Sequence, residues 1–415
     1  MSSTSGARGV LRLPALARSL CLLLVLGVAS IPAVAQQDPE PAKQPAVTEV
    51  WLVTYGPGEI YWQRFGHNAI WIRDADLGLD HVFNFGFFDF EQESFLLRFL
   101  QGRLLYFAAA IPAQREFAQY ISENRSIRAQ RLGLLPEQAL SLTDYLVNEV
   151  QPQNRDYLYD YYWNNCSTRV RDALDGALGG LLGDVFRPKP AVQNFRQHTR
   201  RLTIPQFGLY LGLEIGLGSP VDQPISRWDE FFAPPVLADG LAQLSGEIAG
   251  DGGPLVLEDV ILYQSSAAPP PLEPGQWWPR YLLLAIIVLS GAFILLRFVP
   301  PLRAMRLAQA WIVLTALAGF VLAYLWFFTD HEAARYNLNL LLFNPMWLLC
   351  LAGRRLAGLG GLLVAGCGAV AVVMTGVYPH QYTADVLASV LPVNFAAAIV
   401  FLRQSGSLQR RSNGP

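Results

Sequence analysis

Two short segments of the 415-residue chain carry side chains that could do covalent chemistry together. In the segment NNCST, Cys166 follows Asn165, a favourable N-cap residue, so the cysteine is expected in the first turn of a helix. Free N–H groups and the helix dipole stabilise a thiolate there, which lowers a thiol pKa that is otherwise about 8.5. In the segment FGHNA, His67 begins an expected strand, and a nearby imidazole could accept the thiol proton.

Cysteine usage favours a chemical role for Cys166. Of the four cysteines, Cys21 lies in an expected signal peptide, while Cys350 and Cys367 lie in apolar segments expected in a membrane. Cys166 then has no disulfide partner in an exported domain, although that compartment favours disulfides. Taken alone, the cysteine could be a small buried residue, and His67 a strand residue with satisfied hydrogen bonds. Their combination in one exported domain favours catalysis.

The elements that must position this pair indicate an α+β domain. Three strands are expected where β-branched and aromatic residues are frequent, at 49–54, 68–73 and 81–88. Three helices follow from apolar periodicity, at 92–100, 136–150 and 167–179. Strands that precede helices favour an α+β fold over a doubly wound sheet. From 180 to 266 the pattern does not order the elements, and His198 is expected at the solvated surface.

The chain divides into six parts by composition. A positive segment, an apolar run and Ala33-Val34-Ala35 predict a signal peptide over 1–35. The remaining parts are a flexible leader, a domain with the cysteine site, a Pro-rich linker, a membrane domain and a tail, at 36–47, 48–266, 267–279, 280–403 and 404–415. The leader and the linker contain no apolar periodicity.

The membrane domain is expected to contain five transmembrane helices. Five apolar stretches approach the ~20 residues that a spanning helix needs, at about 281–296, 307–328, 338–353, 356–377 and 384–402. Arginines gather after the first, third and fifth stretches, whereas the other two loops are mainly acidic. The positive-inside rule then predicts a bacterial inner-membrane protein with a periplasmic N-terminal domain and a cytoplasmic C-terminus.

Polar residues cluster in the outward loop before the third stretch. His331 and Asn339 are the best candidates there for contact with a lipid headgroup or another substrate, and His380 in the second outward loop could join them. The alternative is loop solvation and hydrogen bonding between helices. For the acidic residues of this loop we prefer that alternative.

Composition argues against two other classes of ligand. The net charge is −2, and no dense Lys/Arg block with interleaved aromatic residues is present, so a nucleic-acid partner is not expected. No pair of histidines or cysteines has the spacing of metal ligands, and we expect neither a metal nor a cofactor. The content of 52% hydrophobic and 15% charged residues instead suits a chain shared between water and lipid.

The order of a histidine on a strand before a cysteine on a helix resembles circularly permuted, papain-like members of the NlpC-type superfamily, such as the lecithin:retinol acyltransferase group. Four segments together resemble the Lnb family over about 49 to 402: FGHNAIWI, VFNFGFFDF, NNCST and FTDHEAARYNLNLLLFNP. This resemblance implies a periplasmic domain joined to membrane helices. It also implies lipoprotein N-acyltransferase activity, with a phospholipid as acyl donor and a lipoprotein amine as acceptor.

By position in these motifs, the resemblance makes Cys166 the nucleophile and His67 the base. The residue that orients the imidazole is open between Asn84, Asp89 and His81. Alternation places His81 and Asn84 on opposite faces of a regular strand, so both cannot face one site. We favour Asn84, which lies inside the matching motif, because cysteine enzymes can use an asparagine in this role. Asp89 is then expected to contact substrate.

Three functions compete at this point. An acyltransferase that draws on membrane lipid needs the site held at the bilayer, which five spans would provide. An envelope cysteine peptidase or amidase could use the same pair with water as acceptor, but one anchor would suffice for it. A non-enzymatic envelope assembly module is the third alternative, and inertness of Cys166 to thiol reagents would favour it. We favour the acyltransferase.

Overall fold

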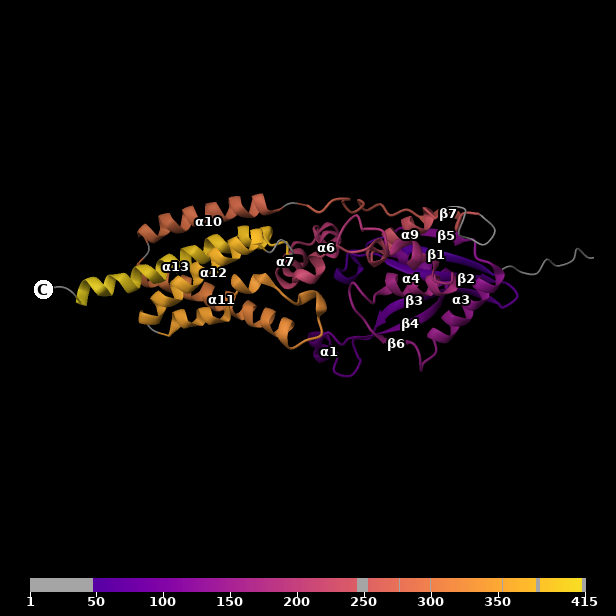
Figure 1. Cartoon of the computed structure of the whole chain (residues 1–415), viewed down its shortest axis with the longest axis horizontal. Coiled ribbons are helices and arrows are strands. Elements are labelled where there is room, and N and C mark those ends of the chain that lie inside the picture. The colour runs from indigo at the N-terminus through magenta and orange to yellow at the C-terminus, as the bar shows by residue number, and fades with distance from the viewer. Residues whose placement is uncertain are drawn as a thin grey trace, which may run out of the picture. The chain divides into compact units, whose positions relative to one another are not determined.

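The computed structural model describes residues 48–244, 253–275, 277–298, 300–352, 354–377 and 381–412. The expected signal peptide and leader, residues 1–47, lie outside the described residues, as does His380. The N-terminal part of the described chain is an α+β domain, and apolar helices follow it (Figure 1). This order agrees with the fold class expected from the sequence.

One antiparallel sheet of seven strands forms the centre of the α+β domain. The spatial order is β6-β4-β3-β2-β1-β5-β7. The strands are β1 (Glu49–Tyr55), β2 (His67–Asp74), β3 (Leu79–Phe88), β4 (Leu105–Pro112), β5 (Ile127–Leu132), β6 (Asp156–Leu158) and β7 (Val256–Tyr263). The three strands expected from sequence are β1, β2 and β3, which lie side by side in the middle of the sheet.

The helices of this domain cover the sheet. Several of them lie between residues 180 and 266, where the sequence did not predict the order of the elements. The helices are α1 (Phe95–Gln101), α2 (Ala113–Ser122), α3 (Pro136–Glu149), α4 (Cys166–Ala177), α5 (Leu181–Phe186), α6 (Phe195–Thr203), α7 (Phe207–Gly216), α8 (Arg227–Glu230) and α9 (Pro234–Ala242). Two short 3₁₀ turns accompany them: η2 (Tyr61–Gln63) lies between β1 and β2, and η3 (Ser219–Asp222) lies between α7 and α8. The helices expected at 92–100, 136–150 and 167–179 correspond to α1, α3 and α4.

Alternation along the strands gives the sheet two different apolar faces. On one face, Leu52 and Ile70 pack in the same core as Val170 and Leu174 of α4. On the other face, Val53, Tyr55 and Ala69 pack with Ala113 of α2. Helices α4 and α2 therefore lie on opposite sides of the central strands.

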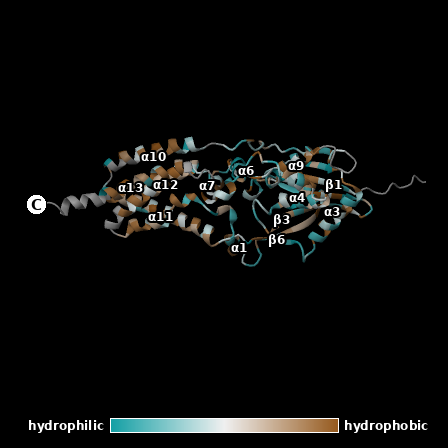
Figure 2. Ribbon diagram, in the orientation of Figure 1, coloured by the Kyte–Doolittle hydropathy of each residue, from teal (hydrophilic) through white to brown (hydrophobic). Residues whose placement is uncertain are grey.

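The C-terminal region contains four long helices, α10 (Trp278–Phe298), α11 (Pro301–Phe327), α12 (Arg354–Val377) and α13 (Ala384–Ser412). The coloured residues of these helices are mainly hydrophobic, whereas the α+β domain contains both hydrophobic and hydrophilic residues (Figure 2). By length and composition, two helical segments of the described chain could cross a membrane, Leu302–Phe327 and Ala384–Arg403. The apolar stretches of α10 and α12 are shorter, at Trp278–Gly291 and Leu359–Met374.

The helix expected at 338–353 does not form as a regular α-helix. The segment is instead two 3₁₀ pieces, η5 (Leu338–Leu341) and η6 (Pro345–Leu351). Asn344 accepts a hydrogen bond from the N–H of Met346, and Pro345 has no N–H to donate, so the chain breaks between the pieces. The segment still runs along α11: Leu342 packs near Leu322, and Trp347 packs near Met305.

Candidate active site

Cys166 is the first residue of α4, as the sequence predicts. Asn165 caps the helix, because its side-chain oxygen accepts a hydrogen bond from the Thr168 N–H at 2.9 Å. The Thr168 hydroxyl in turn accepts from the Asn165 N–H at 2.8 Å, which completes a reciprocal capping arrangement. The Asn165 amide also donates to the Phe232 carbonyl at 3.0 Å, which ties the start of the helix to the core.

The sheet is irregular where it meets Cys166. The register between β3 and β4 shifts between Asn84 and Phe87, and Gly86 adopts a φ of +105°. A Cβ atom at Gly86 would lie 3.5 Å from that of Cys166, so the bulge lets the cysteine approach the strand closely. A glycine is needed here because other residues rarely adopt this φ.

The resting thiol of Cys166 is neutral. Burial raises the pKa of the thiol, while backbone N–H groups of Asn68 and Ser167 and the charge of Arg125 lower it without overcoming burial. The expectation of a lowered pKa is therefore wrong for this structure. The helix start does supply N–H donors to the sulfur, but the sulfur lies in a poorly solvated site that disfavours its charge.

His67 is the first residue of β2 and pairs with Tyr55 of β1. Its ring stacks on Tyr55 and Tyr120, with centroid separations of 5.9 and 6.4 Å. Its Nε2 atom lies 2.8 Å from the side-chain oxygen of Asn84. The structure thus places beside the imidazole the residue that we favoured as its orienting partner.

The orientation of Asn84 determines which ring nitrogen of His67 carries the proton. The Asn84 amide nitrogen donates to Glu116 Oε2 at 2.7 Å and to the Val82 carbonyl at 3.2 Å. Its oxygen therefore faces His67 and can only accept, so Nε2 must be the protonated nitrogen. Nδ1 then keeps a free lone pair, which is the form that a general base needs.

Glu116 is the buried end of this chain of hydrogen bonds, and the sequence did not reveal it. Its Oε1 atom accepts from the Tyr55 hydroxyl at 2.6 Å. Burial raises the pKa of Glu116 to about 7, although the hydrogen bonds from Tyr55 and Asn84 oppose the rise. The residue lies in α2, a helix that we did not expect. An acidic residue on the buried face of that amphipathic helix is the signal that would have identified it.

The imidazole of His67 is neutral at physiological pH. Burial lowers its pKa to about 4, the Asn84 hydrogen bond opposes this, and the nearby charge of Arg125 lowers it further. The site therefore rests as a neutral thiol and a neutral imidazole, not as an ion pair. In this state His67 can accept a proton as soon as the thiol attacks a carbonyl.

Cys166 and His67 lie in one neighbourhood at the end of the central strands, although α4 and the His67 ring belong to different faces of the sheet. The N–H of Asn68, the residue after His67, points to the sulfur, and the Asn68 side chain donates to the Ser167 hydroxyl at 3.0 Å. Burial is the main cause that raises the pKa of Tyr120, which stacks beside His67, and Cys166 adds to the rise. No hydrogen bond joins the thiol and the ring directly, and such contacts often tighten only when substrate binds.

The other expected site residues lie elsewhere. Asp89 is exposed, and its carboxylate accepts a hydrogen bond from the Glu91 N–H at 2.8 Å. His331 lies 2.9 Å from the Phe99 carbonyl of α1 and stacks on Tyr161 at 6.3 Å. Neither residue contacts Cys166.

Asn339 is fully buried, and its amide is in use. It donates to the carbonyls of Glu214 and Ile215 at 3.0 and 2.9 Å, at the C-terminal end of α7. These bonds satisfy helix carbonyls that would otherwise be unpaired. The placement gives Asn339 a packing role, and we do not carry it forward as a substrate ligand.

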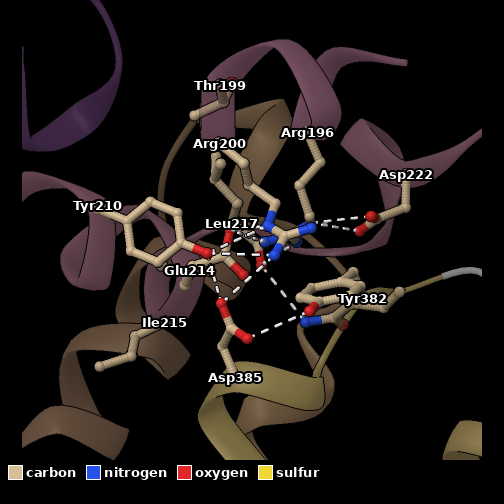
Figure 3. A network of polar contacts seen from close by, with 12 residues as sticks. Arg196, Thr199, Arg200, Tyr210, Glu214, Ile215, Leu217, Asp222, Tyr382 and Asp385 are labelled. Carbon is tan, nitrogen blue, oxygen red and sulfur yellow. Dashed lines mark hydrogen bonds and ion pairs between the residues drawn. The ribbon is translucent and has the colours of Figure 1, made fainter. Parts of the chain in front are cut away.

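A second polar cluster joins the α+β domain to the start of α13 (Figure 3). Arg196 contacts Asp222 at 2.8 Å and Glu214 at 3.7 Å. Arg200 lies 3.5 Å from Glu214 and 3.4 Å from Asp385. Four further groups of the network are Tyr210, whose hydroxyl donates to Asp385, and the labelled neighbours Thr199, Leu217 and Tyr382. We name these contacts the arginine network.

Close to that network, His198 is buried rather than solvated as expected. Only 2% of the residue is exposed, and its Nε2 atom lies 2.9 Å from Glu230. Within the described residues, no group of three or more His, Cys, Asp or Glu side chains could hold a metal ion.

The α+β domain and the apolar helices after it define a membrane protein with a folded domain outside the bilayer. Residues 40–199 match the family model of the Lnb N-terminal periplasmic domain, and residues 273–357 match that of the Lnb transmembrane domain. Together the matches cover more than half of the chain, which therefore belongs to the Lnb family. No curated protein and no solved structure matches the chain.

Proposed function

We propose that this protein is an acyltransferase that moves a fatty acyl chain from a phospholipid to the α-amine of a lipoprotein through a thioester at Cys166. The observations that carry the proposal are the hydrogen-bond chain from Glu116 through Asn84 to His67, which leaves Nδ1 unbonded within the described residues, and the thiol at the start of α4, to which the N–H of Asn68, the residue after His67, points. Nucleophile, base and orienting residue are the parts of a cysteine acyl-transfer site.

The first step forms the thioester. His67 Nδ1 accepts the Cys166 proton as the sulfur attacks the ester carbonyl of the phospholipid. Backbone N–H groups of Asn68 and Ser167, which already point to the sulfur, lie near the developing oxyanion. The C–O bond then breaks, and the imidazolium returns the proton to the leaving lysophospholipid.

The second step forms an amide. The lipoprotein α-amine attacks the thioester carbonyl, and His67 accepts a proton from the amine. The C–S bond breaks, and the sulfur leaves as a thiolate that regains its proton from the imidazolium. The products are an N-acylated lipoprotein and the free enzyme, so no cofactor is consumed.

The membrane half supports a lipid substrate. The chain has a transmembrane domain of the Lnb family directly after the cysteine domain, which holds the site beside the donor. We propose a bacterial inner-membrane location with a cytoplasmic C-terminus, because arginines follow the first, third and fifth apolar stretches. A peptidase or amidase would need only one anchor.

The test is the intact mass of the purified full-length protein after incubation with phospholipid vesicles. We expect a gain of one fatty acyl chain that hydroxylamine removes, and we expect the Cys166→Ala variant to show none. The His67→Ala variant should gain the mass far more slowly. Absence of the adduct with every phospholipid tested, together with cleavage of peptidoglycan fragments, would replace this proposal with the peptidase function.

A further inference from the structure

Helix α1 exposes apolar side chains to an unusual degree for a folded domain. Leu96 and Leu97 are 66% and 52% exposed, and Phe99 and Leu100 are both 43% exposed. The helix buries none of its residues. Clustered exposed apolar residues of this kind indicate contact with another apolar phase or with a partner.

The position of α1 is fixed against the end of membrane helix α11. The N–H of Asp330 donates to the Gln101 carbonyl at 2.9 Å, and Arg103 contacts the Asp330 carboxylate at 2.6 Å. His331 lies 2.9 Å from the Phe99 carbonyl. Asp330 is only three residues beyond the last residue of α11, so α1 lies at the level where that helix leaves the lipid.

The contact leaves no room for adjustment at Gly102. This residue ends α1 with a φ of +73°, and a Cβ atom there would lie 2.9 Å from the His331 backbone nitrogen. A larger residue would strain the backbone and push the outer loop away from α1. The level of α1 is thus set by direct backbone packing on the loop after α11.

A row of aromatic side chains leads from α1 toward Cys166. Its consecutive ring centroids are 6.4, 5.2, 4.9 and 5.2 Å apart, along Phe99, Phe95, Phe90, Phe88 and Tyr106. Tyr106 pairs with Phe88 of β3 and with Tyr157 of β6. A Cβ atom at Gly86, two residues before Phe88, would lie 3.5 Å from that of Cys166 and 4.0 Å from the Tyr157 hydroxyl, so the row ends close to the cysteine. We name these five residues the aromatic row.

The outer part of this row is open to the surroundings. Phe90 is 60% exposed, and Trp62, which contacts both Phe88 and Phe90 edge-on at 5.8 and 6.1 Å, is 56% exposed. Such exposed rings offer an apolar path for a hydrocarbon chain, and aromatic residues are also favoured at the lipid–water boundary.

We infer that α1 lies in the periplasm-facing leaflet of the membrane and that the aromatic row receives the acyl chain of the donor phospholipid on its way to Cys166. The second part of this inference rests on the proposed acyltransferase function, while the first part does not. The donor would rise from the leaflet along Phe90 and Phe88, so its ester reaches the thiol without crossing water.

The immersion of α1 is tested without any activity measurement. An environment-sensitive fluorophore is attached to the Leu97→Cys variant of a Cys166→Ser protein in lipid nanodiscs, and Leu140→Cys on α3 is the matched control, since Leu140 is 50% exposed. Cys166→Ser protein without the added cysteine gives the background from Cys350 and Cys367. We expect blue-shifted emission and quenching by spin-labelled phospholipid only at position 97. Equal, water-like emission at both positions would overturn the immersion.

The acyl route is tested with two donors. Leu97→Glu is expected to lower acyl transfer from vesicles by roughly tenfold, because a charge in the leaflet is disfavoured. Leu140→Glu should leave that rate unchanged. Acylation of Cys166 by a soluble short-chain ester should be equal in both variants, since this donor needs no leaflet. Equal vesicle rates in both variants would overturn the route.

A failure of the proposed function has a different signature. If the wild-type protein were acylated by neither donor, the acyltransferase proposal and the acyl route would both fall. The fluorescence comparison would still decide the position of α1.

Discussion

Two clusters in this molecule each contain a glutamate whose pKa is raised to about 7 by burial. The groups around the two glutamates differ. Glu116 lies at the end of the hydrogen-bond chain to His67. Glu214 lies between Arg196 and Arg200 in the arginine network, and these two charges oppose the rise in its pKa. Figure 3 shows how the acidic groups of the network surround the two guanidinium groups.

The two clusters differ in the charge of the groups that they contain. In the arginine network, each arginine has carboxylates on more than one side, and the charged side chains are at most 7% exposed. The chain from Glu116 instead ends at the neutral imidazole of His67, and the thiol of Cys166 is neutral as well. Hydrogen bonding is incomplete in both clusters, since Nη1 of Arg196 and Oε2 of Glu214 in the network also have no hydrogen-bond partner among the described residues. The proposed chemistry is therefore assigned to the thiol and the imidazole because of the type of these groups.

The largest expected effect is on the reactive cluster. His67→Ala removes the base, and acyl transfer should fall by roughly 10²–10⁴-fold, the usual contribution of a positioned general base. The initial rate of thioester formation in the intact-mass assay measures this loss. A variant with the wild-type rate would contradict the role of His67.

The arginine network should show the reverse pattern. Arg196→Met leaves Asp222 and Glu214 buried without their partner, and removal of one member of a buried ion pair typically costs about 3–5 kcal/mol. We expect a clear drop in the melting temperature of the solubilised protein. Thiol alkylation of the protein that remains folded should match the wild type. Loss of thiol reactivity without loss of stability would mean that the network belongs to the site.

A smaller effect is expected at the glutamate that the sequence did not reveal. Glu116→Gln replaces a carboxyl group, whose two oxygens accept from Tyr55 and Asn84, with an amide that has one acceptor oxygen, so the Asn84 side chain can turn its nitrogen toward His67. The Nε2 proton then loses its acceptor, and a neutral hydrogen bond is worth about 0.5–1.5 kcal/mol. That energy corresponds to roughly a two- to tenfold loss in acylation rate. Glu214→Gln is the matched control, with no rate change expected.

Features that depend on residues close together in the chain could be predicted from the sequence, whereas features that depend on distant residues could not. Asn165 and Cys166 were placed correctly because helix capping depends on residues only three apart. The third membrane stretch was predicted as one helix because its residues are mainly apolar. In the structure, the segment is interrupted at Asn344-Pro345. The burial of His198 depends on Glu230, which is 32 residues away.

Glu116 shows the same limit within the site. It lies 32 residues from Asn84 along the chain and reaches it only because α2 packs on the sheet face that carries His67. The local pattern of α2 could mark Glu116 as a buried acidic residue, but it could not show that this residue contacts Asn84. The aromatic row could not be predicted from the sequence either, since its members come from β3, the turn after it, α1 and β4.

The rest state of the reactive cluster gives a prediction for thiol chemistry. Because burial raises the pKa of Cys166 and lowers that of His67 to about 4, no thiolate–imidazolium pair forms near neutrality. The alkylation rate of Cys166 with iodoacetamide should rise continuously as the pH increases from 5 to 9. A rate plateau that begins near pH 4 would show an ion pair and contradict this state.

The smallest effect is expected in the stability of the wild-type protein against pH. The folded pKa of Glu116 is raised from 4.5 to about 7, so its contribution is full below pH 4.5 and is lost as the pH rises to about 7. The folded pKa of His67 is lowered from 6.5 to about 4, so its contribution is full above pH 6.5 and is lost as the pH falls to about 4. Folding in effect moves one proton from the histidine to the carboxyl group, and the two slopes oppose each other.

Single variants should show each pH dependence of the melting temperature separately, because each variant removes one of the two titrating groups. With Glu116→Gln, only the His67 contribution remains, so the melting temperature should fall more steeply than in the wild type as the pH drops from 6.5 to 4.5. With His67→Gln, only the Glu116 contribution remains, and the melting temperature should fall as the pH rises over the same range. Since the two groups bind the same number of protons in both states here, the wild-type curve should lie between those of the variants. If the melting temperature changed with pH in the same way in all three proteins, the transfer of this proton on folding would be excluded.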